Sequence, residues 1–579
     1  MSVDASRVCT APHAVEATAF GTDACNGGGG GGGPPLGLVD SEGKACRLSL
    51  LSFGAPHMRS FHLAWLSHFV AVLATFAAAP LLPVIRDNLD LTKSQVAAAG
   101  IAAVAGTVAS RVVMGGVCDR WGPRHGAAAL LLLTASATFG MAAVEDAAGY
   151  LAARLFIGCS LAAFVSCQYW CSVMFTPRIV GTANAVAAGW GNSAGGFVQL
   201  LMPLLLAALE HSQPQFIAWR NCYFVVGWLQ VVVGLLVLTL GQDLPGGNFG
   251  ALRRRGDMIR PNTAREYWAA CRNYRTWILC ICYGFSFGME LTMNNVLSQY
   301  LYDQFNTNLT AAGALASLFG FCNLFSRPAG GLLSDLAARR LGMRGRLWVL
   351  YLLQSVAAAF CCGLSRFGGS LGGTMAMAVC MALAVTAASG ATFGVVPFVS
   401  RRGLGAVNGI VGSGSSLGSI LLQALFFTGS SINWSQGFLL MGFVALAATC
   451  LLFAIHFPMW GGMLPWPAPP AAQASLSGLS LEEAYYSRDF TAEERQRGLH
   501  HSVLRFAAES VSQRGSRRAG ALAEGATVHC QCGPLAATMA AATASTAAAS
   551  RGMAPPAGSR SRVAVHNMSA GKAFVGEGG

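Results

Sequence analysis

The sequence has few charged residues. Only 11% of its 579 residues are Asp, Glu, Lys or Arg, whereas a typical soluble domain contains about 25%. At the same time 54% of the residues are hydrophobic, and the mean hydropathy is +0.50. Apolar runs long enough to cross a bilayer recur between about residues 62 and 457. This composition argues against a soluble protein and predicts an all-α polytopic membrane protein.

Patterns typical of enzymes, metal sites and nucleic-acid binding are also missing. The net charge of +13 comes from arginines in short loops and in the C-terminal segment, as expected beside a membrane. Many of the 18 cysteines lie inside apolar runs, where a thiol behaves as a small hydrophobic group. Cys530 and Cys532 form an isolated pair in a low-complexity segment. We therefore predict no catalytic residue, no metal site, no cofactor and no nucleic-acid partner.

The N-terminus lacks the pattern of a signal peptide. Residues 1–58 have no basic start followed by an apolar core, and they contain seven consecutive glycines from Gly27 to Gly33. Such a segment cannot bury enough apolar surface to fold. We expect a disordered cytoplasmic segment, so the first membrane span must act as the insertion signal.

Twelve apolar segments follow, six on each side of a polar stretch. They predict an N-terminal six-helix half over 59–241, a cytoplasmic central loop over 242–275, a C-terminal six-helix half over 276–457 and a mostly disordered cytoplasmic tail over 458–579. Within the second half, the seventh span is predicted over about 276–302 and the eighth over about 311–335. One short helix is expected at the start of the tail.

Arginines mark one side of the membrane. That side includes Arg253, Arg254, Arg255, Arg260, Arg265, Arg272 and Arg275 of the central loop, and Arg120, Arg124, Arg178, Arg339, Arg340, Arg344, Arg346, Arg401 and Arg402 of shorter loops. The opposite side offers Arg86, Lys93, Arg220 and Arg366. Because loops rich in Lys and Arg stay in the cytoplasm, both termini and the central loop are predicted to be cytoplasmic.

The two halves contain an internal repeat. Arg111 in the second span is followed by Gly115 and Asp119, and at the same spacing Arg327 in the eighth span is followed by Gly331 and Asp335. Likewise Gly181, Asn184 and Gln199 in the fifth span recur as Gly405, Asn408 and Gln423 in the eleventh. Two related six-helix halves are typical of one class of secondary transporter.

Arg111 and Arg327 are expected near the middle of the membrane. Each precedes its aspartate by eight residues, which corresponds to roughly 12 Å of helix. A charge at this depth costs about 2.5–3.5 kcal/mol and needs a partner or a wet cavity. Glu290 in the seventh span is the one clear acidic candidate. One acid for two arginines leaves net positive charge, which favours an anion site; a purely structural role for both arginines is the alternative.

Other residues in the spans have both packing and binding interpretations. The glycine-rich stretches 188–196 and 412–419 allow close helix contact, and Asn192 in the first of them adds a hydrogen-bond donor that suggests a ligand wall. Tyr283 and Phe287 are four residues apart and share one helix face, where they either pack or meet a ligand. For Arg154 we expect a packing or gating role.

Several longer stretches match a known pattern. They are GVCDRWGPR at 116–124, Arg154 with Gly158, AGWGNSAGG at 188–196, CYGFSFGMELTMNNV at 282–296, GATFGVVPFVSRRGLG at 390–405 and GLHHSVLRFAAES at 498–510. The first two resemble motifs of the major facilitator superfamily. The others resemble its nitrate/nitrite porter family, and in particular the high-affinity nitrate transporters of algae and plants. The likeness covers about residues 60–518.

The resemblance implies a fold and a site. It implies the major facilitator fold, with Arg111 and Arg327 holding nitrate and with Tyr283 and Phe287 against the plane of the anion. It also implies that Asn192, Gly189, Gly191 and Ser416 shape the pocket, and that Asp119, Arg120, Arg124, Arg154 and Asp335 have gating or structural roles. Ala194 and Ser416 stand where the family usually has Gly and Asn.

We expect the chain to import nitrate, with nitrite as a further substrate, by alternating access in the plasma membrane. An interior-negative potential of about 100 mV opposes each anion by about 2.3 kcal/mol, so uptake needs more than one cation per nitrate. This favours proton symport, with Glu290 as the candidate proton carrier. The alternative functions are a nitrate/nitrite exchanger, a carrier of another small anion and a nitrate sensor. The alternative location is an organelle envelope. A small single-span accessory protein is implied as a partner by the resemblance.

Overall fold

Apolar helices make up most of the part of the chain that can be described. The computed structural model describes residues 39, 43–255, 263–307, 309–427, 432–464 and 481–496. All of them belong to one unit, Met1–Ala519, whereas the second unit, Gly520–Gly579, lies outside the described residues. Most of the predicted terminal segments, 1–58 and 458–579, therefore also lie outside them.

The N-terminal half consists of helices interrupted by short 3₁₀ turns. It contains α1 (His57–Phe76), η1 (Ala79–Leu81), α2 (Leu82–Asn88), α3 (Lys93–Trp121), α4 (Pro123–Gly140), η2 (Met141–Ala143), α5 (Ala147–Gly158), η3 (Cys159–Ala162), α6 (Ala163–Met174), α7 (Val180–Asn192), α8 (Ala194–Glu210) and α9 (Gln215–Leu240). Two short helices, α10 (Phe249–Arg255) and α11 (Thr263–Arg272), lie in the segment between the halves.

The C-terminal half follows the same plan. It contains α12 (Tyr274–Phe305), α13 (Leu309–Phe321), η4 (Cys322–Leu324), α14 (Ser326–Leu341), α15 (Met343–Leu364), α16 (Leu371–Thr392), η5 (Val396–Phe398), α17 (Leu404–Phe426), α18 (Trp434–Cys450) and η6 (Leu451–Ala454). Two antiparallel strands of two residues each, β1 (His456–Phe457) and β2 (Gly461–Gly462), follow. The last described helices are α20 (Leu481–Ser487) and α21 (Ala492–Gln496).

Eleven helical stretches within the described residues are long and apolar enough to cross a membrane. The predicted eighth span is not among them. The turn η4 divides it into α13 and α14, and α14 carries Arg327, Asp335, Arg339 and Arg340. Counted with this polar, interrupted pass, the described chain has the twelve passes expected from the sequence.

Several spans are broken near their middle. The fifth is interrupted at Ser193, between α7 and α8, and the fourth and eighth are interrupted by η3 and η4. Breaks of this kind free backbone groups from the helix, and in transporters they occur beside substrate sites. The sequence predicted continuous spans here, because a 3₁₀ turn leaves no mark in an apolar run.

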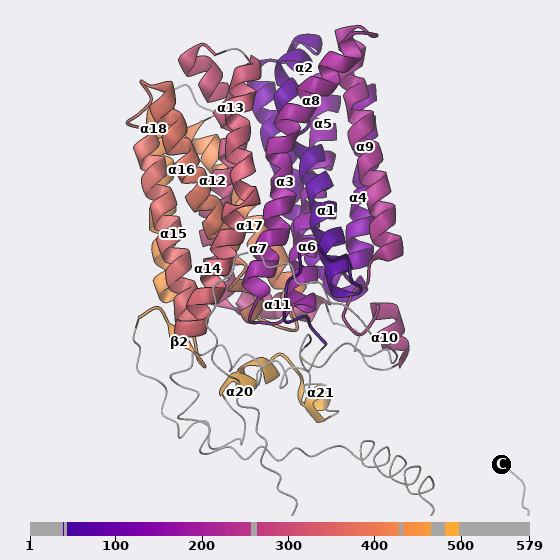
Figure 1. Ribbon diagram of the computed structural model, residues 1–579, viewed down its shortest axis with the longest axis vertical. Helices are drawn as coiled ribbons and strands as arrows, with labels where there is room; N and C mark the ends of the chain where they lie inside the picture. The colour runs from indigo at the N-terminus through magenta and orange to yellow at the C-terminus, as the bar shows by residue number, and fades with distance from the viewer. Residues whose placement is uncertain are drawn as a thin grey trace, which may run out of the picture. The chain divides into compact units, whose positions relative to one another are not determined.

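Helices of opposite halves lie side by side at several places, and α8, for example, packs against α13. The helix α3 packs against α17, and α7 packs against α14 (Figure 1). We call the end of the bundle where α10 and α11 lie the α11 end, and the opposite end, near α2, the α2 end (Figure 1). The α3–α17 and α7–α14 pairs hold most of the residues singled out from the sequence.

Candidate anion-binding site

Arg111 of α3 is completely buried against α17. Its Nη1 donates to the carbonyl oxygen of Gly412 and to Oγ of Ser415, both at 2.6 Å, and more weakly to Oγ of Ser416 at 3.4 Å. Its Nε donates to the carbonyl oxygen of Leu161 at 3.4 Å. Neutral oxygens thus surround this cation, and the glycine-rich stretch 412–419 of the predicted eleventh span supplies most of them.

Arg327 at the start of α14 is also completely buried, and it lies close to the one acid in this region. Its Nη1 is 3.9 Å from Oε2 of Glu290, whose Oε1 accepts a hydrogen bond from Nδ2 of Asn323 at 2.7 Å. Its Nη2 donates to the hydroxyl of Tyr283 at 2.9 Å. Glu290 therefore serves as a counter-ion for Arg327, and Arg111 has no acidic partner among the described residues.

Stacked aromatic rings lie beside both arginines. Tyr283 and Phe287 stack at 5.2 Å and 11°, and each is nearly parallel to Phe164 of α6 at 6.1 Å. The guanidinium carbons of Arg111 and Arg327 lie 5.2 and 5.6 Å from the centre of the Phe164 ring. Phe393 packs edge-on against Phe164 at 5.0 Å. The π faces partly offset the repulsion between two cations held this close to the same rings.

The end of α7 brings further groups to this region. Asn192 is the last residue of the helix, and its Oδ1 is 2.9 Å from Nε2 of His68 in α1. A Cβ on Gly189 would lie 2.5 Å from the carbonyl oxygen of Asn323, and one on Gly191 would lie 2.4 Å from the His68 ring. Only glycine fits at these two positions, which explains how α7 approaches both neighbours so closely.

Buried hydrogen-bond donors in this region lack partners. Within the described residues, Nη2 of Arg111, Nε and Nη1 of Arg327 and Nδ2 of Asn192 make no hydrogen bond. Arg111, Arg327 and Glu290 together carry a net charge of +1 when ionised. A buried N–H group without a partner costs free energy, which an anion with several acceptor oxygens would recover. The arrangement therefore suits a small oxyanion.

Four residues of this region were missed from the sequence. Phe164 and Phe393 lie in apolar spans where an aromatic residue gives no particular signal, and Asn323 lies in a helix break that was not predicted. His68 did give a signal, since it is an ionisable residue inside an apolar run.

The halves also touch through two aspartates at the α11 end. Asp119 accepts hydrogen bonds from the backbone N–H groups of Gly405 and Ala406, both at 3.0 Å. Asp335 accepts from the backbone N–H and the hydroxyl of Thr182 at 2.6 and 2.7 Å. Each aspartate thus binds the first turn of a helix of the opposite half. These contacts are the counterparts that the internal repeat indicated.

The second aspartate has a buried cation as an additional partner. Oδ1 of Asp335 lies 2.6 Å from Nη1 of Arg346, and the two side chains are 2% and 1% exposed. No described arginine pairs in this way with Asp119. Both aspartates therefore accept backbone N–H groups of the opposite half, but among the described residues only Asp335 also has an arginine as an ion-pair partner.

The remaining predicted arginines lie away from the cluster of Arg111 and Arg327. Arg154 of α5 donates from Nη1 to the carbonyl oxygen of Thr75 at 2.5 Å, which ties α5 to α1. Arg124 donates to the end of α9 at Leu238 at 3.2 Å, and Asp243 accepts its backbone N–H at 3.1 Å. Arg120 is exposed and lies over the ring of Trp121, 5.1 Å from its centre. These arginines contact residues of the N-terminal half and Asp243 of the segment that follows it.

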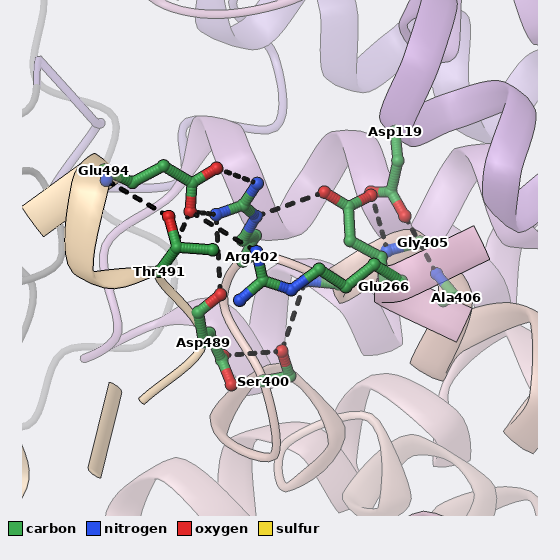
Figure 2. Close-up of polar contacts among 11 residues, drawn as sticks. Asp119, Glu266, Ser400, Arg402, Gly405, Ala406, Asp489, Thr491 and Glu494 are labelled. Carbon is green, nitrogen blue, oxygen red and sulfur yellow. Dashed lines mark hydrogen bonds and ion pairs between the residues drawn. The ribbon is translucent and has the colours of Figure 1, made fainter. Parts of the chain in front are cut away.

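The described end of the tail, around Asp489 and Glu494, contacts the loop before α17. This loop is next to the start of α17, which Asp119 binds. Nη1 and Nη2 of Arg402 donate to Oε2 and Oε1 of Glu494 at 2.6 and 2.9 Å, and Nε donates to Oε1 of Glu266 in α11 at 3.3 Å (Figure 2). Arg402 holds the pKa of Glu494 at about 2. Asp489 accepts a hydrogen bond from Ser400 at 3.1 Å, while burial raises its pKa to about 6. The tail thus contacts the segment that leads directly into the inter-half contact.

Replacing Glu494 by glutamine is expected to loosen this docking. The substitution removes the charge from a two-point hydrogen bond, which contributes about 1.5–3 kcal/mol. Amide hydrogen exchange in residues 485–496 should therefore become about 10-fold faster or more. Glu493→Gln is the matched control, because Glu493 is exposed on the same helix. Equal exchange in both variants would show that Arg402 does not hold the tail.

The chain is similar to known membrane transporters. The Major Facilitator Superfamily matches residues 64–343. The rice protein "High-affinity nitrate transporter 2.3" (Oryza sativa subsp. japonica) is 45% identical over 496 residues, which cover 86% of this chain and 94% of that protein. "Nitrate transporter 2.1" of Chlamydomonas reinhardtii is 45% identical over 490 residues, which cover 83% and 87% of the two chains.

A solved structure supports the architecture. The crystal structure of a human organic anion transporter matches 69% of this chain and 100% of its own with a TM-score of 0.51, at 15% identity. At that identity the match concerns the fold alone. Together with the helices described above, it confirms the prediction of a twelve-helix major facilitator fold. By its identity to the rice and algal proteins, the chain belongs to the family of the high-affinity nitrate transporters of plants and algae, within the major facilitator superfamily.

Proposed function

We propose that the chain transports nitrate, with nitrite as a further substrate, and that the anion binds between Arg111 and Arg327. The observation that carries this proposal is the set of buried N–H groups without partners around two arginines that share the same aromatic neighbours. Nitrate is planar, carries one negative charge and only accepts hydrogen bonds. A guanidinium group offers it several N–H donors in one plane.

The aromatic rings would contribute selectivity by shape. Tyr283, Phe287 and Phe164 are nearly parallel, and a flat anion can lie against such faces without losing hydrogen bonds in its own plane. A tetrahedral anion would leave part of its oxygens against apolar carbon, which costs free energy. Another small planar anion remains the alternative substrate.

Alternating access would require the contacts at the α11 end to break and reform. The two aspartate contacts and the close pairs of Gly115 with Gly405 and Gly181 with Gly331 join the halves at that end. We infer that this end faces the cytoplasm, because the arginine-rich loops lie there, and that the protein acts in the plasma membrane. Release of the anion to the cytoplasm then follows separation of these pairs.

For coupling we propose proton symport, with more than one proton per nitrate. Each cycle would then move net positive charge inward, so voltage would drive the uptake of scarce nitrate. Glu290 is the candidate proton carrier, since it is the acid that pairs with Arg327. Its double engagement by Arg327 and Asn323 favours, as a second candidate function, nitrate/nitrite exchange without protons.

Under symport, nitrate is expected to evoke an inward current. Voltage-clamped oocytes that express the full chain should show a nitrate-dependent current that grows with hyperpolarisation and with falling external pH. Water-injected oocytes serve as the control. Electrically silent uptake that internal nitrite accelerates would identify an exchanger.

Uptake of labelled nitrate by the same oocytes tests the substrate. The assay is run with and without the small single-span accessory protein, which we propose as a partner. Uptake in either case supports transport. Uptake of other anions in preference to nitrate would point to the alternative substrate, and binding of nitrate without uptake would point to a sensor.

A further inference from the structure

His68 is a buried polar residue beside the proposed anion site. It lies in α1 and is completely buried between the last turn of α7 and Phe164. The centres of the His68 and Phe164 rings are 5.3 Å apart. Its one hydrogen bond among the described residues joins Nε2 to Oδ1 of Asn192 at 2.9 Å. The same Phe164 ring has the guanidinium carbons of Arg111 and Arg327 at 5.2 and 5.6 Å from its centre.

The hydrogen bond between His68 and Asn192 determines whether the oxygen or the NH₂ group of the Asn192 amide remains free for another partner. With Oδ1 bound to His68, the NH₂ group of Asn192 is buried and has no hydrogen-bond partner among the described residues. This group can donate to an anion. In the reverse orientation the NH₂ group would bind His68, and the amide oxygen would be left free in place of a donor. That oxygen only accepts hydrogen bonds and has a partial negative charge, so it would disfavour an anion.

The tautomer of His68 selects between these two orientations. A histidine with its proton on Nε2 donates to Oδ1 and leaves the NH₂ group free, whereas one with its proton on Nδ1 accepts from the NH₂ group instead. Close packing limits other arrangements, since a Cβ on Gly191 would lie 2.4 Å from the His68 ring. The imidazole and the end of α7 are therefore fixed relative to each other.

We propose that His68 is a positioning residue of the anion site, which holds the Asn192 amide so that its NH₂ group donates to the bound anion. The proposal rests on the proposed function, since it assumes that nitrate binds at Arg111 and Arg327. It differs from a role in packing alone, because it depends on a hydrogen-bond donor at position 68 and not on the volume of the side chain.

Kinetics of labelled nitrate uptake by the full chain in oocytes can separate the two roles. His68→Phe keeps an aromatic ring but no donor, so the KM for nitrate should rise about 10-fold while the maximal rate per transporter at the surface changes little. His68→Gln can still donate an N–H to Oδ1 of Asn192, so its KM should stay within about 3-fold of the unsubstituted protein. His68→Ala provides a smaller side chain without a donor, in case phenylalanine prevents accumulation.

A double substitution gives a second, independent readout. Asn192→Ala removes the donor itself and should raise the KM by about 10- to 100-fold. If His68 acts through Asn192, adding His68→Phe to Asn192→Ala should raise the KM no further. Additive effects of the two substitutions would overturn the proposal.

The remaining outcomes are also decisive. An unchanged KM in His68→Phe and His68→Ala, or a loss in His68→Gln as large as in His68→Phe, would overturn the proposal that His68 positions Asn192 as a donor. If the unsubstituted protein takes up no nitrate, the proposed function fails and this assignment fails with it. If it does take up nitrate and only the predictions for His68 fail, the proposed function stands without this assignment.

Discussion

Replacing Arg327 by lysine is expected to reduce nitrate uptake about 100-fold or more. A lysine keeps the positive charge, but it loses the flat group of N–H donors that can bind two oxygens of one anion and Tyr283 at the same time. The loss of two hydrogen bonds to a charged partner corresponds to about 3 kcal/mol, or roughly 100-fold. Uptake of labelled nitrate, divided by the amount of protein at the surface, measures the effect.

Arg339 provides the matched control for this substitution. It lies on the same helix, α14, and is exposed, so Arg339→Lys should leave uptake unchanged. Near-normal nitrate affinity in Arg327→Lys would remove Arg327 from the anion site.

Replacing Asp335 by asparagine is expected to impair transport much more than the same change at Asp119. Both aspartates bind the first turn of a helix in the opposite half, but only Asp335 also pairs with a buried arginine. Removing one partner of a buried ion pair costs about 3–5 kcal/mol, because the other charge stays buried. An asparagine at 119 still accepts one of its two N–H groups and leaves no such charge behind.

We therefore expect Asp335→Asn to open the α11 end. Uptake should fall about 10-fold further than in Asp119→Asn, and hydrogen exchange in the first turn of α7, near Thr182, should accelerate. The two variants are controls for each other, since the internal repeat relates their positions. Equal losses in both would show that Arg346 contributes nothing to the contact.

The repeat and the ionisable residues made much of this arrangement predictable from the sequence. Asp119 and Asp335 were related by spacing alone, and in the structure each of them accepts hydrogen bonds from the first turn of a helix in the opposite half. The four-residue spacing of Tyr283 and Phe287 predicted a shared helix face, on which the two rings stack. The predicted seventh span, 276–302, lies within α12, Tyr274–Phe305.

Contacts between distant segments could not be predicted in the same way. Phe164 meets Tyr283 and Phe287 only because α6 and α12 come together in the fold, and no local pattern marks a phenylalanine that will do so. The breaks at Ser193 and η4 lie inside apolar runs that predicted continuous spans. Arg402 and Glu494 are 92 residues apart, and many arginines in the sequence could have paired with that glutamate.

Uptake of labelled nitrate into vesicles that contain the purified full-length protein is the most direct test of the two-arginine site. The account predicts saturable uptake into vesicles with the unsubstituted protein, and no uptake above protein-free vesicles for Arg111→Lys and for Arg327→Lys. Nitrate transport itself would be contradicted if the unsubstituted protein showed no uptake under any of three conditions: an inward proton gradient, internal nitrite, or the accessory protein present. Nitrate uptake that persists in both lysine variants would contradict the two-arginine site.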